Sequence, residues 1–216
     1  MCAVLIVFYV SPKIAKSTVA FAQTDAKKIV YLTFDDGPSD RVTPKILDVL
    51  KEENVKATFF IVGIHAETRK YLIKREIDEG HSVGVHSYSH VYRDIYSSPE
   101  NLLKDIDKCN KIIKEVSGKP STLYRFPGGS HGLSASLIDA VTQHGLKYFD
   151  WNASTRDAEI YKATPQQLFK FAVSTAKDEE NIILLSHDTT NKTTTVDALK
   201  LIIDHYKSLG YSFAAL

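Results

Sequence analysis

Short apolar runs alternate with longer amphipathic stretches along most of this chain. The runs are rich in β-branched and aromatic residues, and several are continuously apolar rather than alternating. Runs of this kind are typical of strands buried on both faces, as in a parallel sheet that helices cover. The pattern predicts strands at 29–34, 57–62, 82–85, 123–126, 146–151, 182–186 and 211–214.

The amphipathic stretches predict helices, and three of them begin with a hydroxyl residue followed by proline. These dipeptides are Thr43-Pro44, Ser98-Pro99 and Thr164-Pro165. A hydroxyl side chain caps the first turn, and proline suits the first helical position because its missing N–H has no partner there. Gln167 completes a capping box with Thr164, and Gly118 is placed to end the second of these helices. Further helices are predicted at 66–79, 134–144 and 195–209.

The regular strand–helix alternation predicts one parallel α/β domain, either barrel-like or doubly wound. A chain of 216 residues suits this, because single α/β or barrel domains often reach about 200–250 residues. Neither an internal repeat nor a linker interrupts the pattern after the N-terminal segment. The domain is therefore expected to span residues 23–216.

Residues 1–22 differ from the rest of the chain. An apolar run at 3–10 (AVLIVFYV) is followed by the small-x-small tripeptide 20–22 (AFA). This combination predicts a secretory signal peptide cleaved after Ala22, and the run is shorter than the roughly 20 residues of a membrane span. No basic residue precedes the run, so an uncleaved N-terminal anchor or a packed N-terminal segment is the alternative. We expect a secreted or cell-envelope protein that meets a membrane only through such an anchor.

Charge and cysteine content narrow the function classes. The chain carries 27 basic and 26 acidic residues, so no basic surplus points to nucleic acid. Cys2 would leave with a signal peptide, and Cys109 then stands alone, which excludes an intramolecular disulfide. Cys109 shares an apolar helical face and is predicted to be a small buried hydrophobe. We expect a monomer.

Polar clusters follow four of the predicted strands, and active sites of parallel α/β folds gather in such loops. The clusters are 33–38 (TFDDGP), 86–90 (HSYSH), 125–129 (RFPGG) and 184–188 (LLSHD). The adjacent carboxylates Asp35 and Asp36 are unfavourable side by side unless a cation or base separates their roles. His86 and His90 are four residues apart and would face one point on a helical turn, and imidazole is the commonest metal ligand.

Two further groups complete the candidate chemistry. Arg125 can hold a carboxylate bidentately and keep it ionised. His187 ends a buried strand and can titrate near neutral pH. Each cluster alone has an ordinary explanation: a tight turn for the Asp pair, an accidental histidine pair, a surface salt bridge for Arg125, and a structural role for His187. Their combination is more specific than any one of them.

In this order the four clusters resemble the motifs of the NodB-homology polysaccharide deacetylases, the fourth carbohydrate esterase family. The resemblance covers residues 29–216. It implies a distorted (β/α) barrel with about seven parallel strands. It also implies a metal-dependent hydrolase that removes N-acetyl groups from N-acetylglucosamine units of a cell-wall polysaccharide.

The resemblance assigns roles to individual residues. Asp36, His86 and His90 would hold a divalent metal, for which zinc is favoured and cobalt, nickel or manganese are alternatives. Asp35, paired with Arg125, would be the general base. The roles that remain are an oxyanion donor (the backbone N–H of Gly128) and a general acid (His187).

Independently of the resemblance, Phe126, Trp151 and Tyr88 are aromatic residues near the site, and each can either stack on a sugar face or belong to the core. Of the other histidines, His65, His81, His144 and His205 receive no role, whereas His131 follows the Gly128-Gly129 turn and is a candidate to line the groove.

The chain departs from the family pattern in two places. Where the family's fourth motif has Asp and Trp, alignment through Trp151 places Ser154 and Ala158, and the neighbouring Asp157 is the candidate to tune His187 in place of the missing acid. Gly128 stands where many members carry a larger residue. We therefore expect an open groove at Ala158, Gly128 and Gly129.

An open groove favours peptidoglycan as the substrate, because alternate sugars of that polymer carry lactyl and peptide groups. Chitin oligosaccharides and acetylxylan are the alternative substrates. A pseudoenzyme that binds polysaccharide without turnover is the alternative class, but such a module would need neither Asp35 nor His187.

Overall fold

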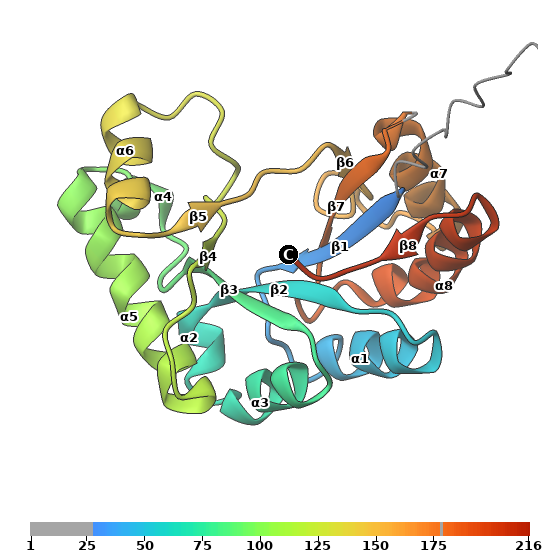
Figure 1. Cartoon of the computed structure of the whole chain (residues 1–216), viewed down its shortest axis with the longest axis horizontal. Coiled ribbons are helices and arrows are strands. Elements are labelled where there is room, and N and C mark those ends of the chain that lie inside the picture. Colours follow the sequence, from blue (N-terminus) through green and yellow to red (C-terminus); the bar gives the residue numbers. More distant parts are fainter. Residues whose placement is uncertain (1–27, 178) are drawn as a thin grey trace, which may run out of the picture.

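The structure, a computed structural model that describes residues 28–177 and 179–216, is built on one curved parallel sheet (Figure 1). Its strands are β1 (Ile29–Asp35), β2 (Ala57–Val62), β3 (Ser82–Ser87), β4 (Leu123–Tyr124), β5 (Lys147–Tyr148), β6 (Ala153–Ser154), β7 (Asn181–His187) and β8 (Ser212–Phe213). Seven of them follow the order β5-β4-β3-β2-β1-β7-β6, and β8 pairs with β1 outside this path. Every pair is parallel. The predicted distorted barrel of about seven parallel strands is confirmed as a curled half-barrel.

The helices cover the outer side of this sheet (Figure 1). They are α1 (Thr43–Glu52), α2 (Gly63–Ala66), α3 (Lys70–Asp78), α4 (Tyr92–Ile95), α5 (Pro99–Ser117), α6 (Ala135–Gln143), α7 (Pro165–Ala176) and α8 (Thr193–Ser208). α5 and α6 lie by β3 to β5, whereas α7 lies by β6 and β7 at the opposite end, and α8 packs against α7 and α1. The core fills the layer between sheet and helices, and the wholly apolar pattern of β2 is buried throughout, as expected for a strand covered on both faces.

The capping predictions are confirmed at two helices and wrong at one. Ser98 caps α5, and the capping box between Thr164 and Gln167 opens α7. Gly118 ends α5 in the left-handed conformation that glycine adopts without steric cost. Thr43 does not cap α1, because its hydroxyl donates instead to the buried carboxylate of Asp188.

Several element boundaries differ from the prediction where the chain turns into functional loops. The runs 123–126 and 146–151 keep only two strand residues each. The predicted helix 66–79 is observed as α3, which begins at Lys70, and the short α2 precedes it. The two-residue β6 and the four-residue α4 were not predicted, since neither is long enough to show a hydrophobic period. Cys109 is fully buried, as predicted.

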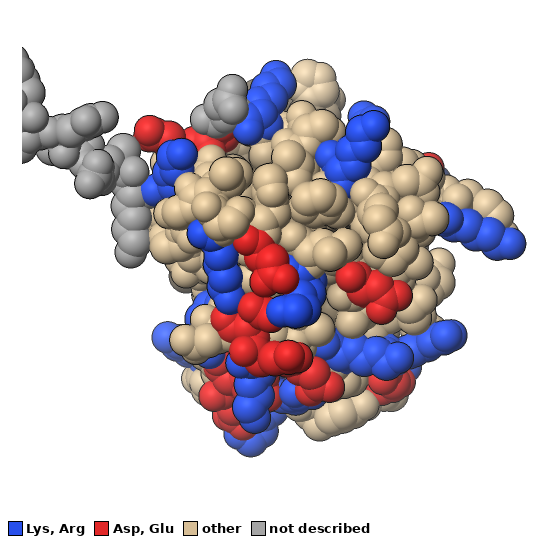
Figure 2. All heavy atoms as spheres, turned by 90° about the vertical axis from the view of Figure 1, so that its right-hand side faces the viewer, with Lys and Arg blue, Asp and Glu red and all other residues tan. Residues whose placement is uncertain are grey.

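The face that carries α7 and α8 presents side chains of both charges (Figure 2). Basic and acidic side chains lie interleaved there (Figure 2), as in the pairs of Glu53 with Lys200 and Lys207. Among the described residues no helix is both long and apolar enough for a bilayer crossing. The predicted signal peptide or anchor at 1–22, with Cys2, lies outside the described residues.

Candidate functional site

The four sequence clusters meet at one edge of the sheet, because parallel strands end at the same edge. Asp35 ends β1 and His187 ends β7, and these two residues are register partners on neighbouring strands. A cavity of about 270 Å³ opens there. Seven of the predicted site residues line it: Asp35, Asp36, His86, His90, Gly128, Trp151 and His187.

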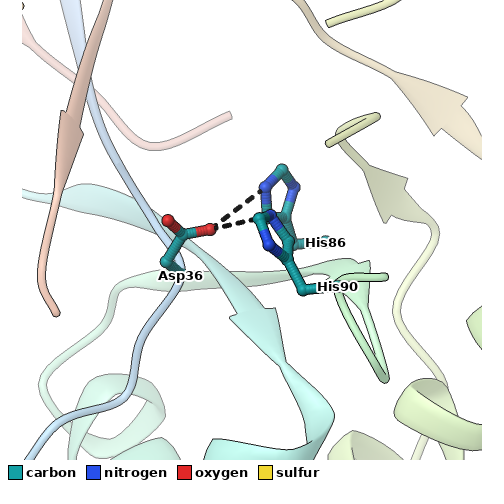
Figure 3. Close-up of side chains that lie close together, drawn as sticks. All are labelled: Asp36, His86 and His90. Atoms are coloured by element: carbon teal, nitrogen blue, oxygen red, sulfur yellow. Dashed lines mark ion pairs between the residues drawn. The ribbon is translucent and has the colours of Figure 1, made fainter. Parts of the chain in front are cut away.

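The predicted metal ligands converge from the end of β1 and from the end of β3 with the loop that follows it (Figure 3). Asp36 Oδ1 lies 3.4 Å from His86 Nε2 and 3.2 Å from His90 Nε2. One ligand atom from each residue lies within 4.8 Å of the other two. One carboxylate and two imidazoles, with further positions open to the cavity, form the donor set of a catalytic metal site.

The histidines do not share a helical turn, so that part of the sequence argument is wrong. His86 belongs to β3, and His90 follows in a loop with a left-handed φ of 57°. The ring of His86 is held by its Nδ1–H, which donates to the carbonyl of Arg125 at 2.8 Å. This bond fixes the tautomer that leaves Nε2 free for a metal.

The charge states of these residues suit a cation. Asp36 Oδ1 is buried, and no described residue gives it a hydrogen bond. Burial raises the pKa of Asp36, but contact with His86 and the charges of His86, His187 and His90 outweigh it and hold the pKa well below its usual range. For His90, burial lowers the pKa and outweighs the opposing charge of Asp36. An ionised Asp36 carboxylate beside a His90 imidazole whose pKa is lowered fits a divalent metal.

A carboxylate on α5 holds the loop between the two histidines. Asp105 Oδ1 accepts hydrogen bonds from Ser87 Oγ at 2.6 Å and from the Tyr88 N–H at 2.7 Å. Its Oδ2 accepts one from the Ser89 N–H at 2.9 Å. The Ser87 hydroxyl in turn accepts from the His90 N–H at 2.9 Å. Asp105 thus positions His90 through Ser87, although the sequence showed it only as one acidic residue of a helix.

Asp35 and Arg125 form a buried ion pair behind the cavity. Arg125 Nη1 donates to Asp35 Oδ1 at 3.0 Å and to Thr33 Oγ1 at 2.7 Å, and Nε donates to the Phe149 carbonyl at 2.8 Å. Arg125 is fully buried, so the surface salt bridge considered as its ordinary explanation is wrong. The second oxygen of Asp35 remains for the cavity and lies 3.9 Å from His86 Nε2.

His187 is oriented by Asp157, the acid that the sequence nominated. The imidazole Nδ1–H donates to Asp157 Oδ1 at 2.7 Å, and the Asp157 carboxylate also accepts from the His187 N–H and from the Thr195 hydroxyl. Burial lowers the pKa of His187, but the hydrogen bond and charge of Asp157, with the charges of Asp35 and Asp36, raise it to about 9. His187 is therefore protonated at neutral pH.

The walls differ from the prediction. Phe126 cannot contact a sugar, because its side chain is fully buried between Tyr124 and Tyr148. The glycines do not leave open space either: a Cβ at Gly128 would lie 3.2 Å from the Tyr92 ring, and one at Gly129 would lie 3.2 Å from the Trp151 ring.

Two contacts at the cavity escaped the sequence argument. Tyr92 lines the cavity, packs edge-on against His90, and is 46% exposed. The Nδ1–H of His65 donates to the Asp36 carbonyl at 2.8 Å, so this histidine supports the loop of a predicted ligand. Neither residue belongs to the four sequence clusters, because His65 lies on α2 and Tyr92 begins α4.

Comparison with known proteins agrees with this geometry. A family model described as polysaccharide deacetylase matches residues 22–149. A peptidoglycan-N-acetylglucosamine deacetylase of Bacillus cereus is 33% identical over 94% of this chain and 76% of its own length. The crystal structure of the catalytic domain of a peptidoglycan N-acetylglucosamine deacetylase from Eubacterium rectale superposes with a TM-score of 0.81 at 37% identity, over 88% of each chain. A family 4 acetyl xylan esterase from Clostridium thermocellum, solved in complex with a cobalt ion, gives a TM-score of 0.77 at 32% identity, over 87% of this chain and 88% of the other.

Proposed function

The chain belongs to the polysaccharide deacetylase family, and from this premise we propose that it removes N-acetyl groups from N-acetylglucosamine units of peptidoglycan with the help of a divalent metal. The observation that carries this proposal is the convergence of Asp36, His86 and His90 on one point. A candidate base, Asp35, and a candidate acid, His187, line the same cavity.

Amide hydrolysis needs an activated water, and the site has a base for it. A divalent metal held by Asp36, His86 and His90 would lower the pKa of a bound water and polarise the acetyl carbonyl. Asp35 can take the proton of the attacking water on Oδ2, because Arg125 occupies Oδ1. Zinc suits the mixed nitrogen and oxygen donors, and cobalt, nickel or manganese also suit them.

Amide hydrolysis also needs a hydrogen-bond donor for the oxyanion and a proton for the departing amine. The N–H of Gly128 has no hydrogen-bond partner within the described chain, and Gly128 lines the cavity. Such a donor contributes about 3–4 kcal/mol to a transition state. His187 is protonated at neutral pH and can give its proton to the departing amine. This complete set argues against a pseudoenzyme.

The preference for peptidoglycan rests on the relatives and on the shape of the site. Ala158 is exposed and lines the catalytic cavity with a small side chain. This position therefore leaves room for substituents on a neighbouring sugar. The test is acetate release from peptidoglycan fragments, chitin oligomers of equal length and acetylxylan, with defined metals added to the metal-free protein. A preference of about tenfold or more for chitin in kcat/KM, equivalent to about 1.4 kcal/mol, would replace the substrate and leave the deacetylase activity standing.

We also propose that the protein acts outside the cell or in its envelope. The apolar run at 3–10 and the tripeptide 20–22 support a signal peptide or an anchor. Fractionation of cells that produce the full chain, with N-terminal sequencing of the product, tests this. A mature protein beginning at Gln23 means cleavage, whereas retention in the cytoplasm contradicts the proposal.

A further inference from the structure

The loop after β5 anchors the segment that carries Gly128. β4 and β5 pair in parallel, so the segment 125–130 and the residues that follow β5 leave the sheet at the same edge. Where the segment begins, Arg125 Nη2 donates to the Asp150 carbonyl at 3.3 Å. Where it ends, the Ser130 N–H donates to Asp150 Oδ1 at 2.9 Å, and the Ser130 hydroxyl donates to Asp150 Oδ2. Asp150 therefore binds both ends of the segment.

The segment needs an anchor because its backbone is permissive. Gly128 and Gly129 have φ values of 79° and 85°, and glycine adopts positive and negative φ about equally readily. A backbone hydrogen bond from the Gly129 N–H to the Phe126 carbonyl, at 2.8 Å, closes the turn. Hydrogen bonds to a charged acceptor are roughly twice as strong as neutral ones. The Asp150 carboxylate, which accepts two from Ser130, thus restricts the glycines more than this backbone bond does.

Two aromatic residues contact the same turn. Gly129 packs on the Trp151 ring, to which a Cβ at this glycine would approach within 3.2 Å. The hydroxyl of Tyr96, which follows α4, donates to the Pro127 carbonyl at 2.8 Å. Gly128 lies between these contacts and lines the catalytic cavity. The turn is thus held from the loop after β5 and from α4 while one of its residues faces the reacting groups.

We propose that Asp150 is a positioning residue for the oxyanion donor: through Ser130 it holds the Gly128 N–H where the reacting acetyl carbonyl becomes negatively charged. An oxyanion donor lowers the barrier because it is oriented before the reaction and needs no reorganisation during it. A Gly-Gly turn without its anchor would have to be ordered in the transition state. The inference rests on the proposed deacetylase function, because amide hydrolysis supplies the oxyanion. It adds a residue outside the four sequence clusters.

The first experiment compares Asp150→Ala with Asp150→Asn. Asn keeps an acceptor for the Ser130 N–H without the charge, whereas Ala removes both acceptors. The matched control is Asp139→Ala, which removes an exposed carboxylate on α6 that does not line the catalytic cavity. With N-acetylglucosamine oligomers and saturating metal, Asp150→Ala should lower kcat roughly 10–100-fold at unchanged KM, less than the roughly 100–1,000-fold of a donor removed outright. Asp150→Asn should recover most of this loss. An unchanged kcat, an equal loss in both variants, or a matching fall in metal affinity would overturn the positioning role.

A tetrahedral inhibitor tests the oxyanion contact itself. A glucosamine oligomer that carries a methylphosphonyl group in place of the acetyl group presents a charged oxygen where the oxyanion forms. Its dissociation constant should rise in Asp150→Ala by the factor by which kcat falls, because both depend on a contact made in the transition state. The deacetylated oligomer, which is the reaction product, should bind unchanged. Equal weakening of both ligands would assign Asp150 a general structural role and reject the inference.

Hydrogen exchange separates this inference from the proposed function, because it needs no turnover. Backbone amides of the segment 126–130 should exchange at least about tenfold faster in Asp150→Ala, as the loss of a hydrogen bond to a charged acceptor predicts. Asp139→Ala should leave them unchanged. A wild-type protein that releases no acetate would reject the proposed function and the oxyanion role with it. Unchanged exchange in Asp150→Ala, in a protein that is active, would reject the anchor alone.

Discussion

The imidazole of His187 donates its Nδ1–H to Asp157 Oδ1 at 2.7 Å, with the carboxylate buried beneath it. This contact sets both the tautomer and the charge of His187. It presents Nε2 to the cavity, and it is the main influence that raises the pKa to about 9 against the effect of burial. Neither Ser154 nor Ala158, which occupy the fourth-motif positions, has a carboxylate. Asp157 provides it instead.

Replacing Asp157 by Asn should shift the alkaline limb of the pH–rate profile to lower pH. Asn can still accept the Nδ1–H bond but carries no charge, so the pKa of His187 should fall from about 9 towards 6.5. At pH 8 the protonated fraction would drop roughly thirtyfold, and kcat/KM with it. The measurement is the pH dependence of kcat/KM. An unchanged alkaline limb would show that His187 is not the acid.

The same contact predicts a pH dependence of stability in the metal-free protein. A histidine whose folded-state pKa is raised contributes stability that is fully present below pH 6.5 and lost as pH rises through about 9. Urea unfolding should therefore show a decline between these values that Asp157→Asn reduces. A decline of equal size in the variant would assign it to another group.

Substitutions at the predicted metal ligands and at the predicted base should have different effects on metal binding. His86→Ala or His90→Ala should weaken metal binding by at least about a hundredfold, since one of three donors is lost. Asp36→Ala should lose both metal and activity. Asp35→Asn should keep the metal and lose the activity, because Asp35 is the proposed base and is not among the three residues that converge as ligands. Metal content after dialysis and acetate release are the two readouts. His144→Ala is the control, as it removes a surface histidine paired with Asp107.

Arg125→Met should destabilise the fold as well as the reaction. It removes the guanidinium that is hydrogen-bonded to Asp35, Thr33 and the Phe149 carbonyl in a fully buried position. Loss of one partner of a buried pair costs about 3–5 kcal/mol, because the other charge is left unpaired.

Urea unfolding measures the cost, with Arg93→Met as the control at an 89% exposed side chain, where changes stay within about 0.5 kcal/mol. The double variant Arg125→Met with Asp35→Asn should recover part of the loss. No recovery would mean that the penalty comes from packing against Phe60 rather than from the charge.

The sequence predicted the site residues that lie at strand ends. It did not predict the residues whose position depends on a contact between elements far apart in the chain. Asp35, His86 and His187 were found because each ends an apolar run whose period is visible in the chain. Tyr92 was missed because its place over Gly128 depends on how the loop after β3 meets the loop after β4. Phe126 was misplaced because an aromatic beside a motif can face the core or the groove, and its neighbours in sequence do not decide which.

Glu76 supplies a test remote from the reacting groups. It is fully buried on α3, and neither carboxylate oxygen has a hydrogen-bond partner in the described chain. Burial, with the charge of Asp188, raises the pKa of Glu76 well above its usual value. When the folded-state pKa of a carboxylic acid is raised, the free energy of unfolding of the protein falls as pH rises above about 4.3, with a slope near 1.4 kcal/mol per pH unit. Glu76→Gln should flatten this slope in urea unfolding, while Glu52→Gln on the exposed side of α1 should leave it.

The last prediction concerns Asp105, which neither belongs to the predicted ligand set nor lines the catalytic cavity. Its carboxylate accepts three hydrogen bonds from the 87–89 loop, and Ser87 passes this constraint to the His90 N–H. His90 holds a left-handed φ of 57°, a conformation that costs a histidine energy and persists only when its surroundings impose it. Asp105→Ala should release the loop. Bringing His90 next to Asp36 and His86 would then cost conformational entropy.

The expected result is a fall in metal affinity of about 10–100-fold, the usual effect of removing a group that orients a ligand, with kcat restored at saturating metal. Asp107→Ala is the matched control, since Asp107 lies on the same helix and pairs with the exposed His144. A purely structural role would lower the free energy of unfolding and leave the metal dissociation constant unchanged. If Asp105→Ala lowers kcat but not metal affinity, the loop acts on substrate rather than on His90, and the positioning role is wrong.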